Sequence, residues 1–236
     1  MRHPHQEPPV NPLPPLAIAL AAIVFAVEVI FQLGARGLIG GPQAVSWRRD
    51  ALLQYGFSDA AFDRMIELSV WNTEAVTRMI TYPFVHYGMG QTLFIVVLVL
   101  ALGKWVGERL AQWTIPVIFV ASAVVGAAVY GLLLDTPVVL VGGFPAAYGL
   151  IGAFTFLLWT RLAETGGPQS RAFVLIGALM GIQLVFGLIG GLLSSGSGPV
   201  RMDWVADLAG FVAGFGLTVL LSPGGWARMV DRLRQR

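Results

Sequence analysis

Two carboxylic acids, Glu28 and Asp207, lie inside long apolar runs of the sequence. Burying an ionisable side chain at membrane depth is costly, so such residues mark functional sites by default. For Glu28 we favour a structural hydrogen bond, because Gln32 lies one helical turn away. A paired aspartyl site at Asp207 would need a second acid facing it at close range. The apolar runs between residues 92 and 193 supply none.

Other nucleophile and base candidates are few. The chain has no cysteine, which excludes thiolate chemistry. Lys104 is the only lysine and lies at the end of an apolar run, where membrane topology explains it, so we do not expect a Ser-Lys pair. We expect Ser122 to bond back to its own helix. Three further serines lie in a glycine-rich loop that holds no base, and His86 is the candidate base for one of them: Ser194, Ser195 and Ser197.

The composition is that of an integral membrane protein. Hydrophobic residues make up 56% of the 236 positions and charged residues 12%, whereas soluble domains carry about 25% charged residues. Most of the 15 lysines and arginines flank apolar runs, so we interpret them as topology signals and expect membrane lipids, not nucleic acid, as partners. His3 and His5 are too few for a metal site, and we expect no metal or other cofactor.

The apolar runs predict an all-α bundle of six transmembrane helices, because each run is long enough to cross a bilayer. Residues 34–90 carry too many charges to span, and their aromatic residues favour a long interfacial loop between the first two helices. The six predicted spans are Leu16–Leu33, Thr92–Val106, Ile115–Leu134, Val138–Trp159, Ala172–Leu193 and Trp204–Leu221.

Basic residues fix the predicted orientation. Arg201 alone falls on one side when the long loop is set aside, and the others fall on the opposite side, which we expect to be cytoplasmic. Those others are Arg2, Lys104, Arg109, Arg161, Arg171, Arg228, Arg232, Arg234 and Arg236. The expected organisation is a disordered proline-rich cytoplasmic tail (1–15), a transmembrane domain (16–222) with loop 34–90 outside, and a basic cytoplasmic tail (223–236).

Small residues recur at the spacing that lets membrane helices approach closely. Gly177 and Gly181 share one predicted helix, and Gly210 and Gly214 share another. This pattern predicts close packing and by itself indicates no chemistry.

Five local motifs, in order between Arg78 and Leu221, carry a family resemblance. Arg78 precedes Phe84-x-His86, and Gly103 and Glu108 close the second span. Gly142-x-Phe144 leads through Tyr148 to Gly152, and Ala206-Asp207 leads through Gly210 to Gly214. In this order the motifs resemble the rhomboid family of intramembrane serine peptidases.

The resemblance implies a fold and a set of site positions. In the family a serine opening the fourth span attacks the peptide carbonyl and a histidine on the sixth takes its proton. Phe144 stands at the serine position here and Asp207 at the histidine position. The oxyanion positions of the second span hold Gln91 and Ile95. We therefore expect no catalytic residue at these positions, although the family is an enzyme family.

The sequence thus predicts a rhomboid-like pseudoprotease in a bacterial inner (plasma) membrane, with both termini cytoplasmic, that binds transmembrane segments of client proteins. An active rhomboid endopeptidase with a non-standard dyad is the alternative, and a small transporter or lipid-handling protein is a third. Candidate structural or functional residues are Tyr148, Asp207, Arg78, His86, Glu108, Gly142, Gly210 and Gly214. We also expect the Tyr148 hydroxyl to bond to Asp207, because both groups need a partner when buried.

Overall fold

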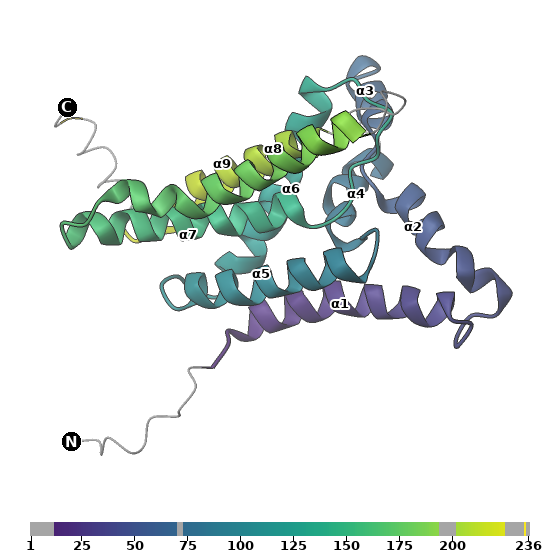
Figure 1. The fold of residues 1–236 in the computed structure, drawn as a ribbon, viewed down its shortest axis with the longest axis horizontal. Helices are drawn as coiled ribbons and strands as arrows, with labels where there is room; N and C mark the ends of the chain where they lie inside the picture. Colours follow the sequence, from purple (N-terminus) through teal and green to yellow (C-terminus); the bar gives the residue numbers. More distant parts are fainter. Residues whose placement is uncertain (1–11, 70–72, 194–201, 225–233, 235–236) are drawn as a thin grey trace.

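The computed structural model describes residues 12–69, 73–193, 202–224 and 234 (Figure 1). Most of the proline-rich tail, Ser194, Ser195, Ser197 and most of the basic C-terminal tail lie outside these residues. All elements of the described part are helical, and the only bridge of β type there joins Phe57 to Leu140. The all-α prediction is therefore confirmed.

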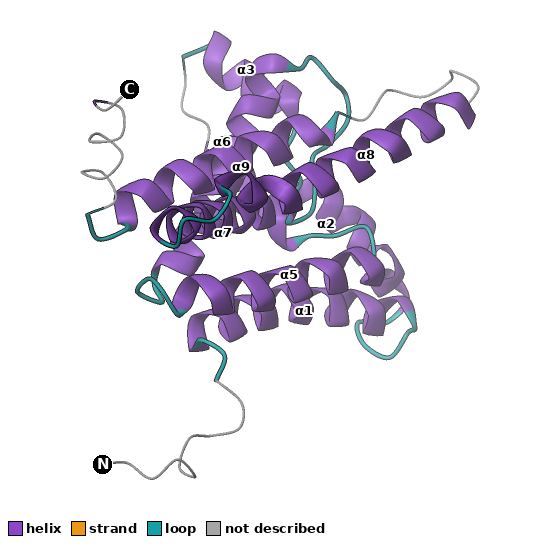
Figure 2. Cartoon of the chain, turned by 60° about the vertical axis from the view of Figure 1, so that its left-hand side comes forward, coloured by secondary structure: helices purple, strands orange, loops and turns teal. Residues whose placement is uncertain are grey.

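Five helices are long and apolar enough to cross a membrane: α1 (Pro15–Ala35), α5 (Met89–Gly107), α6 (Thr114–Leu133), α7 (Phe144–Glu164) and α9 (Asp203–Leu221). They confirm an integral membrane protein. A further helix, α8 (Val174–Leu193), has 20 residues and no charged side chain. Its role as a sixth span stays a prediction. Figure 2 shows α8 extending beyond the other helices at one end.

The fourth span begins later than predicted. Val138 was expected to open it, but the helix starts at Phe144. Leu140 instead exchanges backbone hydrogen bonds with Phe57 at 2.9 and 3.0 Å, which holds this stretch extended. Gly142 then turns the chain with φ +94°, a conformation that L side chains rarely adopt.

The described residues between α1 and α5 fold into short helices at one end of the bundle (Figure 1). They are η2 (Pro42–Ser46), α2 (Trp47–Tyr55), α3 (Asp59–Glu67), α4 (Thr73–Thr81) and η3 (Tyr82–Phe84). Several apolar side chains of this segment are exposed, among them Leu38, Leu53 and Leu68. Such exposure is compatible with the predicted interfacial position, because apolar side chains at that depth contact lipid.

Helix α7 lies against α5, α6 and α9 and forms the centre of the core. Its contact with α9 depends on glycine, because a Cβ at Gly210 would strike the Pro145 carbonyl and one at Gly214 would strike the Gly149 carbonyl. The predicted close packing is thus confirmed for this pair. For Gly177 and Gly181 a Cβ would meet no described atom within 4 Å, so close packing at these two positions stays a prediction.

Reporter fusions test the predicted topology. A reporter after Leu193 and one at Arg236 are expected to report opposite sides of the membrane, because α9 would separate them if both α8 and α9 span. The same side for both fusions would contradict the six-span prediction.

Candidate functional site

The candidate site lies at the start of α7, where the loop before α5 holds the turn that precedes the helix. The Gly142 N–H donates to the Tyr82 carbonyl at 3.0 Å, and the Gly143 N–H donates to the Nε2 atom of His86 at 3.2 Å. Gly143 caps α7, since its carbonyl accepts from the Ala147 N–H at 2.8 Å. Both backbone donors of the two glycines are therefore already satisfied within the chain.

His86 is a buried structural group. Its Nε2 accepts a hydrogen bond, so the neutral ring keeps its proton on Nδ1, on the side of a backbone hydrogen bond with Phe84. Burial lowers the pKa of His86 from 6.5 to about 4, against a smaller opposing effect of Glu28. With both ring nitrogens engaged, His86 is unsuited to act as a base for a serine.

Gln91 and Ile95 face the same turn from the first part of α5. The Gln91 Oε1 accepts from the Tyr87 N–H at 3.0 Å, and a Cβ on Gly142 would clash with the amide nitrogen of Gln91. Ile95 is fully buried, and its Cγ2 would lie 3.0 Å from a Cβ on Gly143. The structure therefore brings these predicted positions together with the start of α7.

The first two residues of α7 point into packing contacts. The half-buried Phe144 ring lies 5.9 Å from the Phe94 ring of α5, measured between centroids. Pro145 is buried and packs toward Gly126 of α6 and Gly210 of α9. Apolar contacts thus close the junction of α5, α6, α7 and α9 at this level.

Asp207 of α9 is buried, and its partner differs from the expected one. The Gln183 Nε2 of α8 donates to Asp207 Oδ2 at 2.7 Å. The predicted bond from Tyr148 is wrong, because Asp207 Oδ1 has no partner among the described residues and Oδ2 accepts from Gln183. Tyr148 is also buried and lies close enough for an electrostatic interaction with Asp207, but no hydrogen bond joins its hydroxyl to the carboxylate.

A comparison with protein families decides the identity. The Rhomboid domain matches residues 73–224, which covers more than half of the chain, including α5 to α9. The chain belongs to the rhomboid family. No curated protein matches it. The rhomboid match covers the four elements that meet at the start of α7, so the expected fold class is confirmed at the level of the family.

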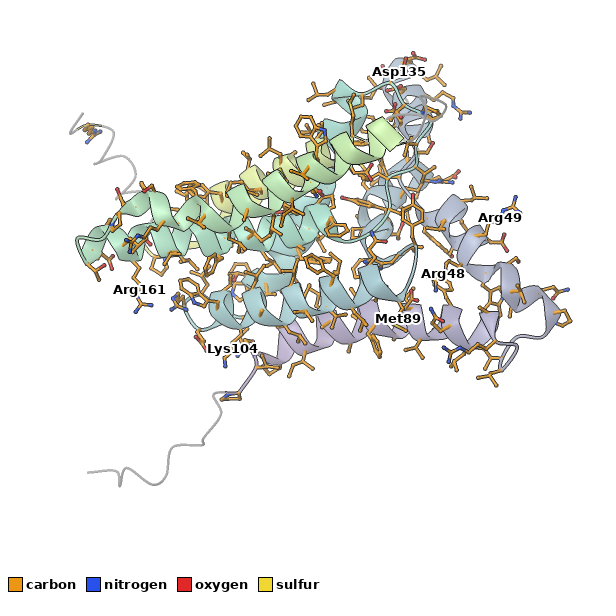
Figure 3. All side chains as sticks on the ribbon, in the orientation of Figure 1. Arg48, Arg49, Met89, Lys104, Asp135 and Arg161 are labelled. Atoms are coloured by element: carbon orange, nitrogen blue, oxygen red, sulfur yellow. The ribbon has the colours of Figure 1, made fainter. Side chains whose placement is uncertain are left out.

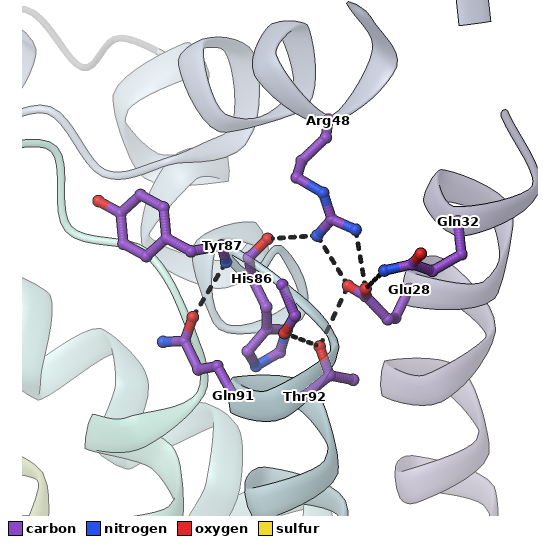
Figure 4. Close-up of polar contacts among 8 residues, drawn as sticks. Glu28, Gln32, Arg48, His86, Tyr87, Gln91 and Thr92 are labelled. Carbon is purple, nitrogen blue, oxygen red and sulfur yellow. Dashed lines mark hydrogen bonds and ion pairs between the residues drawn. The ribbon is translucent and has the colours of Figure 1, made fainter. Parts of the chain in front are cut away.

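A second polar cluster of this rhomboid protein lies beside the site, around Glu28 of α1 (Figure 4). Arg48 of α2 makes two hydrogen bonds to the Glu28 carboxylate, at 2.7 and 2.8 Å, and a third to the His86 carbonyl at 2.9 Å. Gln32 donates to the same carboxylate at 2.8 Å, as expected from its spacing. The Thr92 hydroxyl of α5 lies 3.2 Å from it. This cluster connects α1, α2 and α5 to the residue that holds α7.

Arg78 and Glu108 lie apart from the site. Arg78 bonds to Glu74 at 2.7 Å and to the carbonyls of Leu53 and Gly56 at 2.8 and 3.0 Å, so it ties α4 to the end of α2. Glu108 caps α5 at the opposite end and lies 3.7 Å from Arg109. Arg78 therefore holds the short helices before α5 together, and Glu108 lies at the far end of α5 from Phe144.

Ser122 differs from its expected role. Its buried hydroxyl has no hydrogen-bond partner among the described residues, so the predicted bond to its own helix is wrong. The side chain packs against Gly149 of α7, where a Cβ would clash with it. Within the described residues, no group of three or more His, Cys, Asp or Glu side chains is arranged to hold a metal ion.

Variants of Asp207 test its contact with α8. The free energy of unfolding of Asp207→Asn is expected to lie within about 1 kcal/mol of that of the parent. The oxygen of the new asparagine still accepts from Gln183, and its amide can donate to Gln183 Oε1, which is unpaired among the described residues. Asp207→Leu strands the Gln183 amide and is expected to cost about 1 to 3 kcal/mol. Unfolding in mixed micelles measures both, and no recovery in the Asp207→Leu/Gln183→Leu double variant would contradict the contact.

Proposed function

We propose that this rhomboid-family protein is a pseudoprotease that binds transmembrane helices of client proteins without cutting them. What carries the proposal is the motif resemblance, which assigns Phe144 and Asp207 to the family's serine and histidine positions. A phenyl ring has no lone pair to attack a carbonyl, and a carboxylate without a hydroxyl partner activates no nucleophile.

The surroundings of these residues support the proposal. The Phe144 ring packs against Phe94, and Asp207 accepts from Gln183 instead of facing a nucleophile. The N–H groups of Gly142 and Gly143 donate to Tyr82 and His86, so neither is available to a substrate oxyanion. Ile95 offers no polar atom at the second oxyanion position.

The purified protein is expected not to cleave a rhomboid-type transmembrane substrate. The Phe144→Ser/Asp207→His double variant is expected to gain little or no activity, because loss of a single oxyanion donor typically costs about 10²-fold or more in rate. Gel analysis of a labelled substrate and reaction with a fluorophosphonate probe measure both expectations.

The alternative is an active endopeptidase with a non-standard dyad. Cleavage or probe labelling by the parent protein would support that alternative and contradict the proposal. Ser122→Ala, together with replacement of Ser194, Ser195 and Ser197 by alanine, would then locate the nucleophile.

A binding experiment addresses the second half of the proposal. The same substrate, carrying a photo-cross-linker in its transmembrane helix, is expected to cross-link to the protein and remain full length. An unrelated helix of the same length serves as the control. Equal cross-linking of both helices would contradict selective binding of client helices, even if cleavage were absent.

A further inference from the structure

Two guanidinium groups and an ammonium group gather at the end of α5 and α7 that lies away from the candidate site. Trp105 of α5 contacts Phe154 of α7, with ring centroids 4.7 Å apart. Arg161 follows Phe154 by seven residues, which is two turns on the same face of α7, and Arg109 lies in the turn just after α5 ends at Gly107. Because both helices start at the same turn around Gly142, they run in the same direction and bring both arginines to one end. Figure 3 shows Lys104 and Arg161 at this end.

The Arg109 guanidinium is held in place on an aromatic platform. Its central carbon lies 3.3 Å from the centre of the Trp105 ring, and its Nη1 donates to the Trp105 carbonyl at 2.9 Å. The Glu108 carboxylate lies 3.7 Å from the same Nη1. All these polar contacts use Nη1, so the Nε and Nη2 donors of Arg109 have no bond to the described residues.

Arg161 adds a second charge close to the first. Its exposed guanidinium makes no hydrogen bond to the described part of the chain. Burial is the main cause that lowers the pKa of Arg109, and the positive charge of Arg161 contributes in the same direction. Two like charges held together cost free energy, and an anion placed between them offsets that cost.

We propose that Arg109 and Arg161, which share this end of the molecule with Lys104, form a binding site for the phosphate headgroup of an anionic phospholipid. The three residues lie at the ends of two membrane-spanning helices, where lipid phosphates are found. The indole of Trp105 beside them suits the boundary between acyl chains and headgroups. The topology predicted from the basic residues places this end in the cytoplasmic leaflet, which carries the anionic lipids. The preference for basic residues on the cytoplasmic side explains why cations are present at this end. It does not explain why Arg109 is stacked on Trp105 next to a second arginine.

Native mass spectrometry of the full chain in a nonionic detergent tests the site. The parent protein is titrated with short-chain phosphatidylglycerol, with phosphatidylcholine of the same chain length, and with inorganic phosphate. We expect preferential binding of phosphatidylglycerol. Arg109→Gln/Arg161→Gln is expected to weaken that binding about 25-fold, at about fivefold for each charge removed near the headgroups.

The control variant is Arg36→Gln/Arg49→Gln, which removes the same charge from exposed positions at the end of α1 and on α2 and should bind as the parent does. Arg161→Gln alone, which removes no bond to the described residues, should weaken binding about fivefold and keeps the test valid if the double variant misfolds. Equal binding of the two lipids, or unchanged binding by Arg161→Gln, would overturn the proposal. Displacement of the lipid by an equal concentration of inorganic phosphate would show a site for free phosphate instead.

Discussion

Arg48→Ala is expected to lower the free energy of unfolding by about 3 to 5 kcal/mol, because it leaves the Glu28 carboxylate buried without its charged partner. Glu28 is 1% exposed and Arg48 is 21% exposed, so the carboxylate depends on the guanidinium far more than the reverse. Gln32 and Thr92 still contact the carboxylate in the variant, but neither carries a compensating charge. Unfolding in mixed micelles of an ionic and a nonionic detergent measures the loss.

Arg49→Ala is the matched control for this experiment. Arg49 is the next residue of the same helix, has the same charge and is exposed, and Figure 3 shows it on the other side of α2 from Arg48. Its replacement is expected to change stability by less than about 0.5 kcal/mol. Equal effects of the two substitutions would contradict the role of the ion pair.

Replacing both partners distinguishes the net contribution of the Glu28–Arg48 ion pair from the cost of leaving the Glu28 carboxylate buried without a partner. Glu28→Leu/Arg48→Leu is expected to be more stable than Arg48→Ala, since removing both members of a buried pair costs less than removing one. A double-mutant cycle between the two positions should show coupling of at least about 1 kcal/mol. Coupling near zero would mean that Glu28 is stabilised by Gln32 and Thr92 alone.

The spans were predictable from sequence because crossing a bilayer requires a long apolar segment, and a run of consecutive residues satisfies that requirement without help from the rest of the chain. The five long helices α1, α5, α6, α7 and α9 coincide with predicted runs for this reason. The start of α7 was missed because apolar residues 138–141 satisfy the same hydropathy rule. What keeps them out of the helix is the bridge between Phe57 and Leu140, which joins residues far apart in the chain.

The polar partners were less predictable, because they come from other helices. Gln32 was found as the partner of Glu28 from its helical spacing, whereas Arg48 lies 20 residues away across a turn and its charge alone suggested only an interfacial loop. Gln183 is 24 residues from Asp207, on a different helix. Tyr148 was expected to be the partner of Asp207. A family resemblance aligns positions, but it does not say which neighbouring helix supplies the nearest hydrogen-bond donor.

His86 shows the same limit at the candidate site. Its motif placed it before the second span, but its two bonding partners, Phe84 and Gly143, follow only from the folded chain. From the sequence, His86 was a candidate base for a serine. In the structure His86 accepts a hydrogen bond from the Gly143 N–H at the start of α7, so protonation of the ring would lower the stability of the fold.

Lowering the pH from 7 to 4 is expected to remove about 3 kcal/mol of stability through His86. Its pKa is lowered from 6.5 to about 4 in the folded protein, chiefly by burial, so folding favours the neutral ring. That contribution is complete above pH 6.5 and is lost as the pH falls from 6.5 through about 4, because the unfolded chain takes up the proton first. The shift from 6.5 to about 4 corresponds to about 3 kcal/mol at 1.36 kcal/mol per pH unit.

The variant His86→Gln isolates this effect. Its amide oxygen can still accept from the Gly143 N–H, but it does not titrate, so stability between pH 6.5 and 4 should fall by about 3 kcal/mol less than in the parent. Glu28 and Arg48, which act on the charge of His86 in opposite directions, are present in both proteins. Asp59, whose pKa is raised mainly by burial, favours the folded state as the pH falls, and it also cancels in the comparison.

The only other histidines, His3 and His5, are replaced by glutamine in both proteins to remove their titration. His86→Leu provides the complementary variant: it strands the Gly143 N–H and is expected to cost about 1 to 3 kcal/mol at pH 7, where His86→Gln costs less. The free energy of unfolding measured at half-unit steps from pH 7 to 4 gives both results. Parallel curves for the parent and His86→Gln would show that the ring is not held neutral against the start of α7.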